Sequence, residues 1–201
     1  MTDAHSDGMT WVENLLHLDY RIMLYVNHSW SHPLLDDLAL LFRESIFHIP
    51  LYLFLLLFAF RIFGKNGWYW LLGAGVLIGV SDLVSSHLIK EWVGRPRPCR
   101  DPVMAHQIRF LAKYCGMNGS FTSSHAFNHF AFATYAHFTL RKHASWMFLL
   151  YPWAGLIAYS QVYVGVHYPS DVMAGALLGI VFGWAGQRIV RQPLSLHPLQ
   201  S

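Results

Sequence analysis

Charged residues are scarce in this chain of 201 residues, and their scarcity excludes most classes of soluble protein. Asp, Glu, Lys and Arg make up 12% of the sequence, about half the usual share, whereas 54% of it is hydrophobic. The net charge of +3 is too small to indicate a nucleic-acid partner. Residues 1–10 lack the basic start and the cleavage site of a signal peptide, so we expect the mature protein to begin near Met1. Length and composition together indicate one membrane domain, residues 1–201.

Long stretches without charge indicate the membrane-spanning helices. A span needs about 20 mostly apolar residues. The first candidate, residues 46–60, is short, and it crosses the membrane only if its helix starts near Leu34 and bends at Pro50. Residues 11–31, where charged residues interrupt apolar ones, suit a helix that lies in the membrane interface. We therefore predict an all-α, polytopic transmembrane helix bundle of about five spans with an N-terminal interfacial helix. The five candidate stretches are residues 46–60, 68–89, 122–140, 144–170 and 172–187.

Acidic residues are absent from three segments that this topology places on one membrane face: the link after the first span, the link after the third span, and the C-terminal tail. By the positive-inside rule, these segments face the cytoplasm. The long loop 91–121 then lies on the extracytoplasmic side. The basic residues of the three segments are Arg61, Lys65, Arg141, Lys142, Arg188 and Arg191.

The chain has only two cysteines, Cys99 and Cys115, and both fall in the loop 91–121. An oxidising compartment would let them form a disulfide that closes a ring of 17 residues. The alternatives are two free thiols, or half of a metal site with neighbouring His106. The disulfide is favoured because it agrees with the extracytoplasmic position of the loop.

Three segments carry polar residues that are costly at membrane depth, and such residues indicate a functional site. The predicted topology brings all three to the extracytoplasmic face. Lys90 and Arg97 offer positive donors there, and Ser123 offers hydrogen bonds together with the amides that open the third span. This combination suits an anionic phosphate. The segments are residues 90–98, 121–125 and 160–171.

Two histidines and an aspartate add chemistry to this phosphate site. Asp171 follows His167 by four residues, so its carboxylate can orient the imidazole and stabilise the cation formed when the ring attacks phosphorus. His125 is the candidate general acid, which protonates the leaving oxygen and then takes a proton from water. The remaining histidines are scattered without ligand spacing, so we expect no metal and no other cofactor.

The three segments resemble the signature of the type-2 phosphatidic acid phosphatase (PAP2) superfamily. That signature reads Lys, six residues, Arg-Pro; then Pro-Ser-Gly-His; then Ser-Arg, five residues, His, three residues, Asp. Lys90, Arg97 and Pro98 fit its first part fully, and the match covers roughly residues 85–180. The other matching positions are Ser123, His125, Ser160, His167 and Asp171.

Three positions depart from the signature. Thr122 replaces its Pro, and Ser124 replaces its Gly while keeping the backbone amide and adding a hydroxyl donor. Gln161 replaces its second-position Arg in the third part; a glutamine can donate to a phosphate oxygen but brings no charge. We assign Ser124 and Gln161 to phosphate binding. The candidates for the missing charge are Arg95, Arg100 and Arg109.

The resemblance implies a metal-independent phosphatase with a haloperoxidase-like core, in which His167 is the nucleophile and His125 the acid. The substrates it implies are membrane lipids that enter from the outer leaflet: undecaprenyl diphosphate, phosphatidylglycerol phosphate, phosphatidic acid or a lipid A phosphate. The compact chain looks bacterial, which places the site on the periplasmic face of the inner membrane. The alternatives are a lipid phosphotransferase with the same phosphohistidine and a weakly catalytic lipid-phosphate binder or transporter.

A stripe of small residues marks the last span, where Gly175, Gly179 and Gly183 recur every four residues. Such stripes let two helices approach closely. We expect the stripe to pack within the bundle, with a homodimer interface as the alternative.

Overall fold

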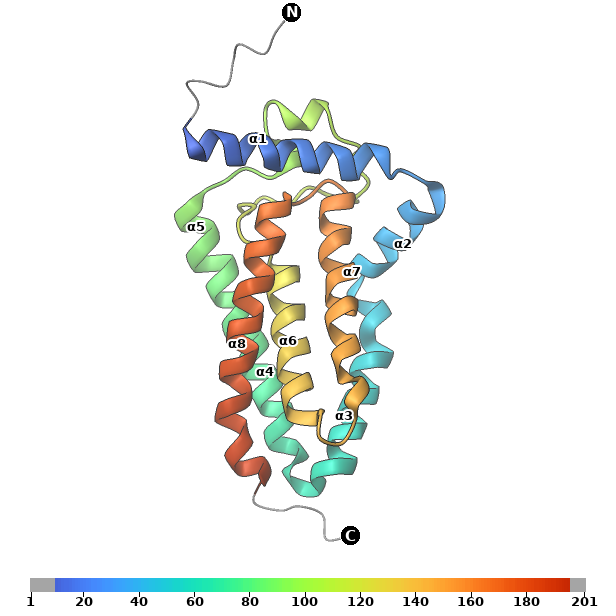
Figure 1. Ribbon diagram of the computed structural model, residues 1–201, viewed down its shortest axis with the longest axis vertical. Helices are drawn as coiled ribbons and strands as arrows, with labels where there is room; N and C mark the ends of the chain where they lie inside the picture. Colours follow the sequence, from blue (N-terminus) through green and yellow to red (C-terminus); the bar gives the residue numbers. More distant parts are fainter. Residues whose placement is uncertain (1–9, 196–201) are drawn as a thin grey trace, which may run out of the picture.

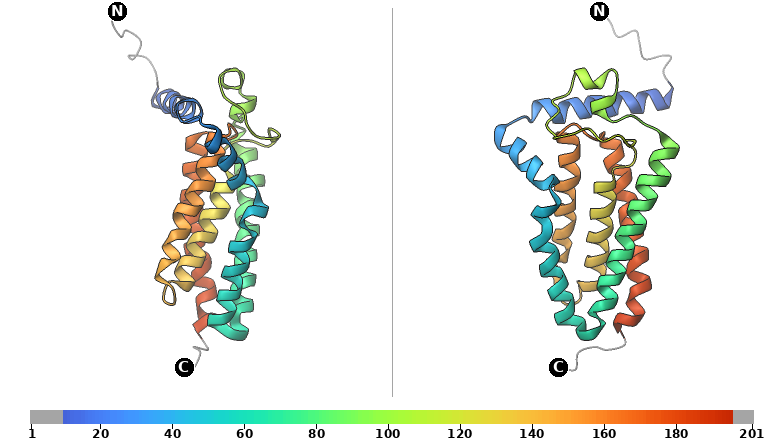
Figure 2. Two further views of the ribbon diagram at one scale, coloured as in Figure 1. Left: turned by 90° about the vertical axis from the view of Figure 1, so that its right-hand side faces the viewer. Right: turned by 180° about the vertical axis from the view of Figure 1, so that it is seen from behind.

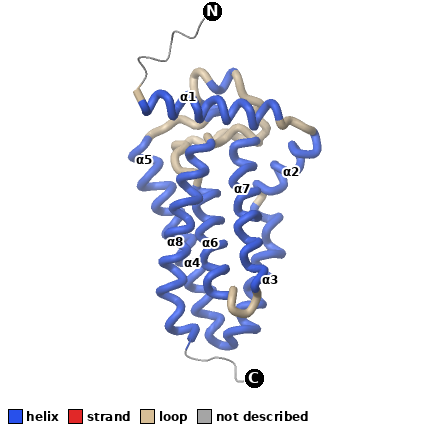
Figure 3. The backbone as a smooth tube through the Cα atoms, in the orientation of Figure 1, coloured by secondary structure: helices blue, strands red, loops and turns tan. Residues whose placement is uncertain are grey.

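The computed structural model describes residues 10–195, and this part of the chain contains helices and no strand (Figures 1 and 3). The all-α prediction is therefore confirmed. The α-helices are α1 (Trp11–Leu24), α2 (Pro33–Arg43), α3 (Ile49–Phe63), α4 (Gly67–Leu83), α5 (Lys90–Val93), α6 (Ser124–Leu140), α7 (Leu150–Tyr163) and α8 (Pro169–Ser195).

The long helices run along one axis, and α1 lies across one end of the bundle (Figures 1 and 2). α4 continues through a π-helical turn, Val84–Ile89, into the short α5. The links between α3 and α4 and between α6 and α7 lie at the other end, with the C-terminal end of α8. The basic segments of the positive-inside argument thus share one end of the molecule, and α1 covers the opposite end.

α6 is the central helix, packed against α4, α7 and α8. It is rich in alanine, and small side chains such as Ala126 and Ala131 are fully buried. The glycine stripe of α8 faces it: a Cβ added at Gly175 would lie 2.6 Å from the Ser123 carbonyl oxygen. At Gly179 an added Cβ would collide with the backbone of α6 as well. The stripe therefore packs within the bundle, as we expected.

The sequence explains why α1 begins at Trp11 and how it sits on the bundle. Thr10 and Glu13 form a reciprocal capping box, which satisfies amides at the helix start. Asp19, Met23 and Asn27 lie four residues apart and are buried, while much of the remaining apolar surface of α1 is exposed. Its exposed apolar residues are Trp11, Leu15, Leu18 and Ile22.

The predicted bend at Pro50 is wrong, because the break comes earlier. α2 ends at Arg43, Glu44 is extended, and a 3-10 turn over Ser45–His48 leads into α3. Pro50 occupies the first turn of α3. Proline is favoured there, since its missing N–H would have no helical partner in any case. The consequence is that Arg43 and the turn lie at the side of the bundle where α2 meets α7.

Two described ranges are long and apolar enough to cross a membrane, Ser45–Val93 and Pro169–Arg191. The first contains a reversal at Gly64–Asn66, so it supplies two legs of the bundle, α3 and α4. The sides of these helices expose apolar residues, as a lipid environment requires. The number of five spans remains a prediction. Exposed apolar residues on α3, α4 and α8 include Leu53, Leu57, Leu72, Val76, Leu177 and Val181.

Candidate active site

The three signature segments meet at the end of the bundle that α1 covers. Lys90 opens α5, and Arg97 follows in the loop after it. Ser123 caps α6, with its hydroxyl accepting from the Ala126 amide at 3.4 Å and its own amide donating to the Asp171 carbonyl oxygen at 3.0 Å. His167 lies in the link between α7 and α8, and Asp171 lies in the first turn of α8.

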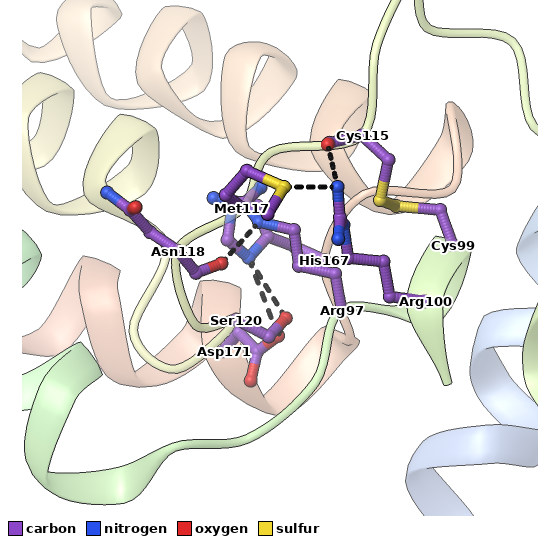
Figure 4. Close-up of a disulfide and its surroundings, with 9 residues drawn as sticks. All are labelled: Arg97, Cys99, Arg100, Cys115, Met117, Asn118, Ser120, His167 and Asp171. Atoms are coloured by element: carbon purple, nitrogen blue, oxygen red, sulfur yellow. Dashed lines mark hydrogen bonds and ion pairs between the residues drawn. A yellow bond between two sulfur atoms is a disulfide. The ribbon is translucent and has the colours of Figure 1, made fainter. Parts of the chain in front are cut away.

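His167 is buried between a guanidinium and a carboxylate (Figure 4). Its Nε2 is 3.2 Å from Arg97 Nη1, and its Nδ1 is 3.5 Å from Asp171 Oδ2. A guanidinium can only donate, so Nε2 must be the accepting nitrogen and the proton sits on Nδ1, toward Asp171. The neutral ring therefore presents a lone pair next to a positive charge.

The Asp171 carboxylate is held by partners from three parts of the chain. Its Oδ2 accepts from the Ser120 hydroxyl and, at 2.9 Å, from the Tyr168 amide. Its Oδ1 pairs with Arg95 Nη1 at 3.0 Å. Ser120 Oγ is also 3.4 Å from His167 Nδ1, so this hydroxyl joins the carboxylate and the imidazole. These contacts fix the rotamer that orients His167.

A tight turn after α7 places His167. The amides of Val166 and His167 both donate to the Gln161 carbonyl oxygen, at 3.1 and 3.2 Å. Gly165 has a φ of +87°, and a Cβ at this position would lie 3.2 Å from the Arg109 carbonyl oxygen. Glycine suits this turn because other residues rarely adopt such backbone angles.

Burial lowers the pKa of His167 to about 4, although the hydrogen bond and charge of Asp171 act in the opposite direction. Nearby Arg97 and Lys90 lower the pKa further, because their positive charges disfavour a second cation. At neutral pH the imidazole is therefore uncharged, which is the form that a nucleophile requires.

Arg97 is positioned by the loop that contains the two cysteines. Its Nε donates to the Asn118 carbonyl oxygen at 3.0 Å. Cys99 and Cys115 are joined by a disulfide in the structure (Figure 4), with their Cα atoms 6.1 Å apart. The Ser120 amide donates to the Arg95 carbonyl oxygen at 2.8 Å. The loop thereby brings Arg97 and Ser120 to opposite sides of His167.

Lys90 belongs to a cluster of hydroxyl groups. Its Nζ donates to Ser124 Oγ at 2.6 Å, and Ser124 also contacts Ser85 at 2.9 Å and Ser86 at 3.1 Å. Ser86 donates in turn to Asp82 at 3.3 Å. Ser124, which stands in the signature's glycine position, thus accepts a hydrogen bond from Lys90 and holds its ammonium group at the start of α6.

His125 lies in the first turn of α6, where helix amides lack helical partners and favour an anion. Its ring stacks on His129, with centroids 6.2 Å apart, and the His129 Nδ1 is 2.7 Å from the His125 carbonyl oxygen. Lys90 and His167 are near enough for their charges to act on His125. His125 thus lies two residues after Ser123, whose amide contacts the Asp171 carbonyl oxygen, at the same end of the bundle as His167.

The loop arginines that we considered as replacements for the missing charge are engaged elsewhere. Arg95 pairs with Asp19 at 2.6 Å and with Asp171, and Arg109 pairs with Asp36 at 2.6 Å. Arg100 donates to the Cys115 carbonyl oxygen and to the Met117 sulfur. The guanidinium that reaches Gln161 is instead that of Arg43, whose Nε lies 3.3 Å from Gln161 Oε1.

Sequence reasoning missed two positions that hold the site together, Ser120 and Asp19. Asp19 accepts from the Ser170 amide at 2.8 Å and ties α1 to the start of α8. One signal was available for Asp19, because it is spaced four residues from Met23 and eight from Asn27. The structure buries all three residues. Ser120 had no comparable signal, because it lies in an irregular loop.

This arrangement can bind a phosphate and attack it. Two cations and a helix start surround an uncharged imidazole whose partner carboxylate can stabilise the cation formed on attack. Within residues 10–195, no group of three or more His, Cys, Asp or Glu side chains is placed to hold a metal ion. The fold and the site together suit a helical membrane phosphatase.

Comparison with known proteins agrees with this class. The family model for the PAP2 superfamily matches residues 68–193, well over half of the chain. The chain is 27% identical to a lipid A 4'-phosphatase of Bacteroides thetaiotaomicron, over 86% of this chain and 77% of that protein. It is 26% identical to a lipid A 4'-phosphatase of Porphyromonas gingivalis, over 86% of this chain and 72% of that protein.

A solved structure shares the fold. It is the transmembrane PAP2-type phosphatidylglycerolphosphate phosphatase of Bacillus subtilis, with a TM-score of 0.68 and 22% identity, covering 98% of this chain and 91% of that one. Because the family model covers residues 68–193, the chain belongs to the PAP2 superfamily. It is a membrane enzyme, a phosphoric ester hydrolase that acts on lipid phosphates.

Proposed function

We propose that this protein removes phosphate from a membrane lipid through a covalent phosphohistidine on His167. The main support is the contact of His167 Nε2 with Arg97 at 3.2 Å. Because Arg97 can only donate, Nε2 must be unprotonated, so the ring is uncharged and its lone pair lies in a cationic site. The carboxylate of Asp171, on the other side of the ring, stabilises the cation that forms on attack.

The reaction has two steps. The Nε2 lone pair forms the bond to phosphorus, the bond from phosphorus to the lipid oxygen breaks, and His125 gives its proton to that oxygen. Water then attacks the phosphohistidine, His125 takes a proton from it, and the bond from nitrogen to phosphorus breaks. Lys90 and Arg97 balance the phosphoryl charge, so we propose a mechanism without a metal ion.

A lipid A phosphate is the first substrate to test, because two relatives that align over most of this chain act on lipid A. Phosphatidylglycerol phosphate, undecaprenyl diphosphate and phosphatidic acid complete the panel. We propose that the site faces the periplasm, since the basic links lie at the opposite end of the bundle.

The test is phosphate release from this panel by the purified protein in detergent and EDTA. We expect hydrolysis of at least one lipid phosphate, and its loss in His167→Asn. The control is His87→Asn, which removes an imidazole that is 66% exposed. Undiminished hydrolysis in His167→Asn would overturn the mechanism, and phosphate loss that needs an acceptor lipid would indicate transfer.

A further inference from the structure

Gln161 stands where the PAP2 signature has an arginine, and its side chain is fully engaged inside the protein. It is buried, with 1% of its surface exposed. Its amide nitrogen donates to the Ile157 carbonyl oxygen at 3.4 Å and to Ser160 Oγ at 3.3 Å. Its oxygen accepts from Arg43 Nε at 3.3 Å. Through these contacts Gln161 fixes the position of the Arg43 guanidinium.

Arg43 brings a positive charge to the site from 118 positions away in the chain. It is the last residue of α2 and is half-buried where α2 meets α7. The carbonyl oxygen of Gln161 accepts from the His167 amide at 3.2 Å, and His167 Nε2 is 3.2 Å from Arg97 Nη1, so the residue that contacts Arg43 also adjoins the phosphate site. In agreement, the pKa of Arg97 is lowered first by burial and next by the charge of Arg43. The charge of Arg43 also acts on His125.

Arg43 also differs from the arginines that serve the fold. Arg95 and Arg109 form ion pairs with carboxylates, whereas Arg43 forms none with any residue from 10 to 195. The charge of the adjacent Glu44 acts on Arg43, but this carboxylate is not within ion-pair distance of it and lies 3.4 Å from Lys113. A half-buried guanidinium close to other cations is unfavourable unless an anion offsets the repulsion.

We propose that Arg43 is the third phosphate-binding cation of the active site and that Gln161 positions it. The Nε group is held by Gln161, which leaves the two terminal nitrogens of the guanidinium to donate to phosphoryl oxygens beside Lys90 and Arg97. The charge missing at position 161 is thereby supplied by another helix. This inference rests on the proposed function, since it assigns a ligand to the same phosphate.

The test measures the affinity of the purified protein for inorganic phosphate by calorimetry, which does not depend on turnover. We expect Arg43→Gln to weaken phosphate binding by about tenfold to a hundredfold, the range for one charged hydrogen bond. Lys113→Gln is the matched control, since it removes an exposed positive charge beside Glu44, and its affinity should equal that of the parent.

Two further variants complete the test. Arg43→Gln combined with Gln161→Arg returns one guanidinium to the site, and we expect it to recover most of the lost affinity. Gln161→Met removes the oxygen that holds Arg43 while keeping a long side chain, so it should weaken phosphate binding without lowering the melting temperature. It keeps the idea testable if Arg43→Gln does not fold.

An unchanged phosphate affinity in a folded Arg43→Gln or in Gln161→Met overturns the role of Arg43. The failure of the proposed function gives a different result: the parent binds phosphate but hydrolyses no lipid phosphate. In that case the phosphate affinities of the variants still decide whether Arg43 is a ligand.

Discussion

Arg95 and Arg97 lie two residues apart and contact different members of the His167–Asp171 pair. Arg95 joins Asp171 to Asp19, and its guanidinium lies 3.8 Å over the ring of Tyr168. Arg97 has no carboxylate within ion-pair distance among residues 10–195 and contacts His167 and the Asn118 carbonyl oxygen. We therefore expect Arg95, which is paired with carboxylates, to stabilise the protein, and Arg97, which is not, to bind the substrate.

The sharpest test of this difference replaces each arginine with glutamine. For Arg97→Gln we expect kcat/KM for a lipid phosphate to fall by about a hundredfold to a thousandfold, because a donor to the transition state is lost. Its melting temperature should not fall, since removing this cation relieves repulsion from Arg43 and Lys90. Kinetics and thermal denaturation in detergent measure the two effects.

Arg95→Gln should show the reverse pattern. It leaves two buried carboxylates, Asp19 and Asp171, without their cation, and the loss of one partner of a buried pair costs about 3–5 kcal/mol. We expect a clear fall in melting temperature. If Arg95→Gln lowers only kcat/KM and keeps the stability of the parent, the distinction between the two arginines is wrong.

The disulfide is expected to stabilise the loop that carries both arginines. Replacing Cys99 and Cys115 with serine should speed thermal inactivation, because a ring of this size contributes about 3 kcal/mol of loop entropy. The measurement is the rate of thermal inactivation with and without dithiothreitol. Reductant should accelerate inactivation of the parent and leave the double variant unchanged; an equal response contradicts the disulfide.

Gly179, in the middle of the glycine stripe, should affect stability alone, because its neighbours are backbone and apolar atoms of α6. In Gly179→Ala the new Cβ meets the backbone of α6, and overpacking of this kind costs about 1–3 kcal/mol. Gly155→Ala on α7 is the control, since an added Cβ meets nothing within 4 Å there. We expect a lower melting temperature only for Gly179→Ala, and equal values would refute the close packing.

The smallest effect concerns pH. Since burial lowers the pKa of His167 to about 4 and the uncharged ring is the nucleophile, the acid side of the pH profile of kcat/KM should fall as the pH drops through that value. Below it, the loss should be about tenfold per pH unit for one proton. If kcat/KM already falls as the pH drops below about 6.5, the pKa of His167 is that of an ordinary imidazole. Assays at pH 7 after a period at pH 4 control for denaturation.

Much of this architecture follows from local sequence. Hydropathy is a local property, so the helix positions could be predicted from it, and a spacing of four residues brings His167 beside Asp171 once α8 begins at Pro169. Helix breaks were harder to predict: Pro50 is compatible with a helix start, and the extended residue is Glu44.

The part of the site that could not be predicted from sequence consists of contacts between distant segments. Asp19 reaches Ser170 across 151 positions, and Arg43 reaches Gln161 across 118. Neither pair follows from helical periodicity, because each depends on how α1 and α2 dock on the bundle. The substitution of arginine by Gln161 indicated that a charge was absent, but only the fold could show which residue lies nearby.

The most direct measurement of the central claim is to trap the phosphoryl intermediate. The protein is mixed with a lipid phosphate carrying a labelled phosphoryl group, quenched in alkali, which preserves phosphohistidine, and digested for mass spectrometry. We expect label on His167 in the parent and none in His167→Asn. Label on another residue, or steady hydrolysis by His167→Asn, would contradict it.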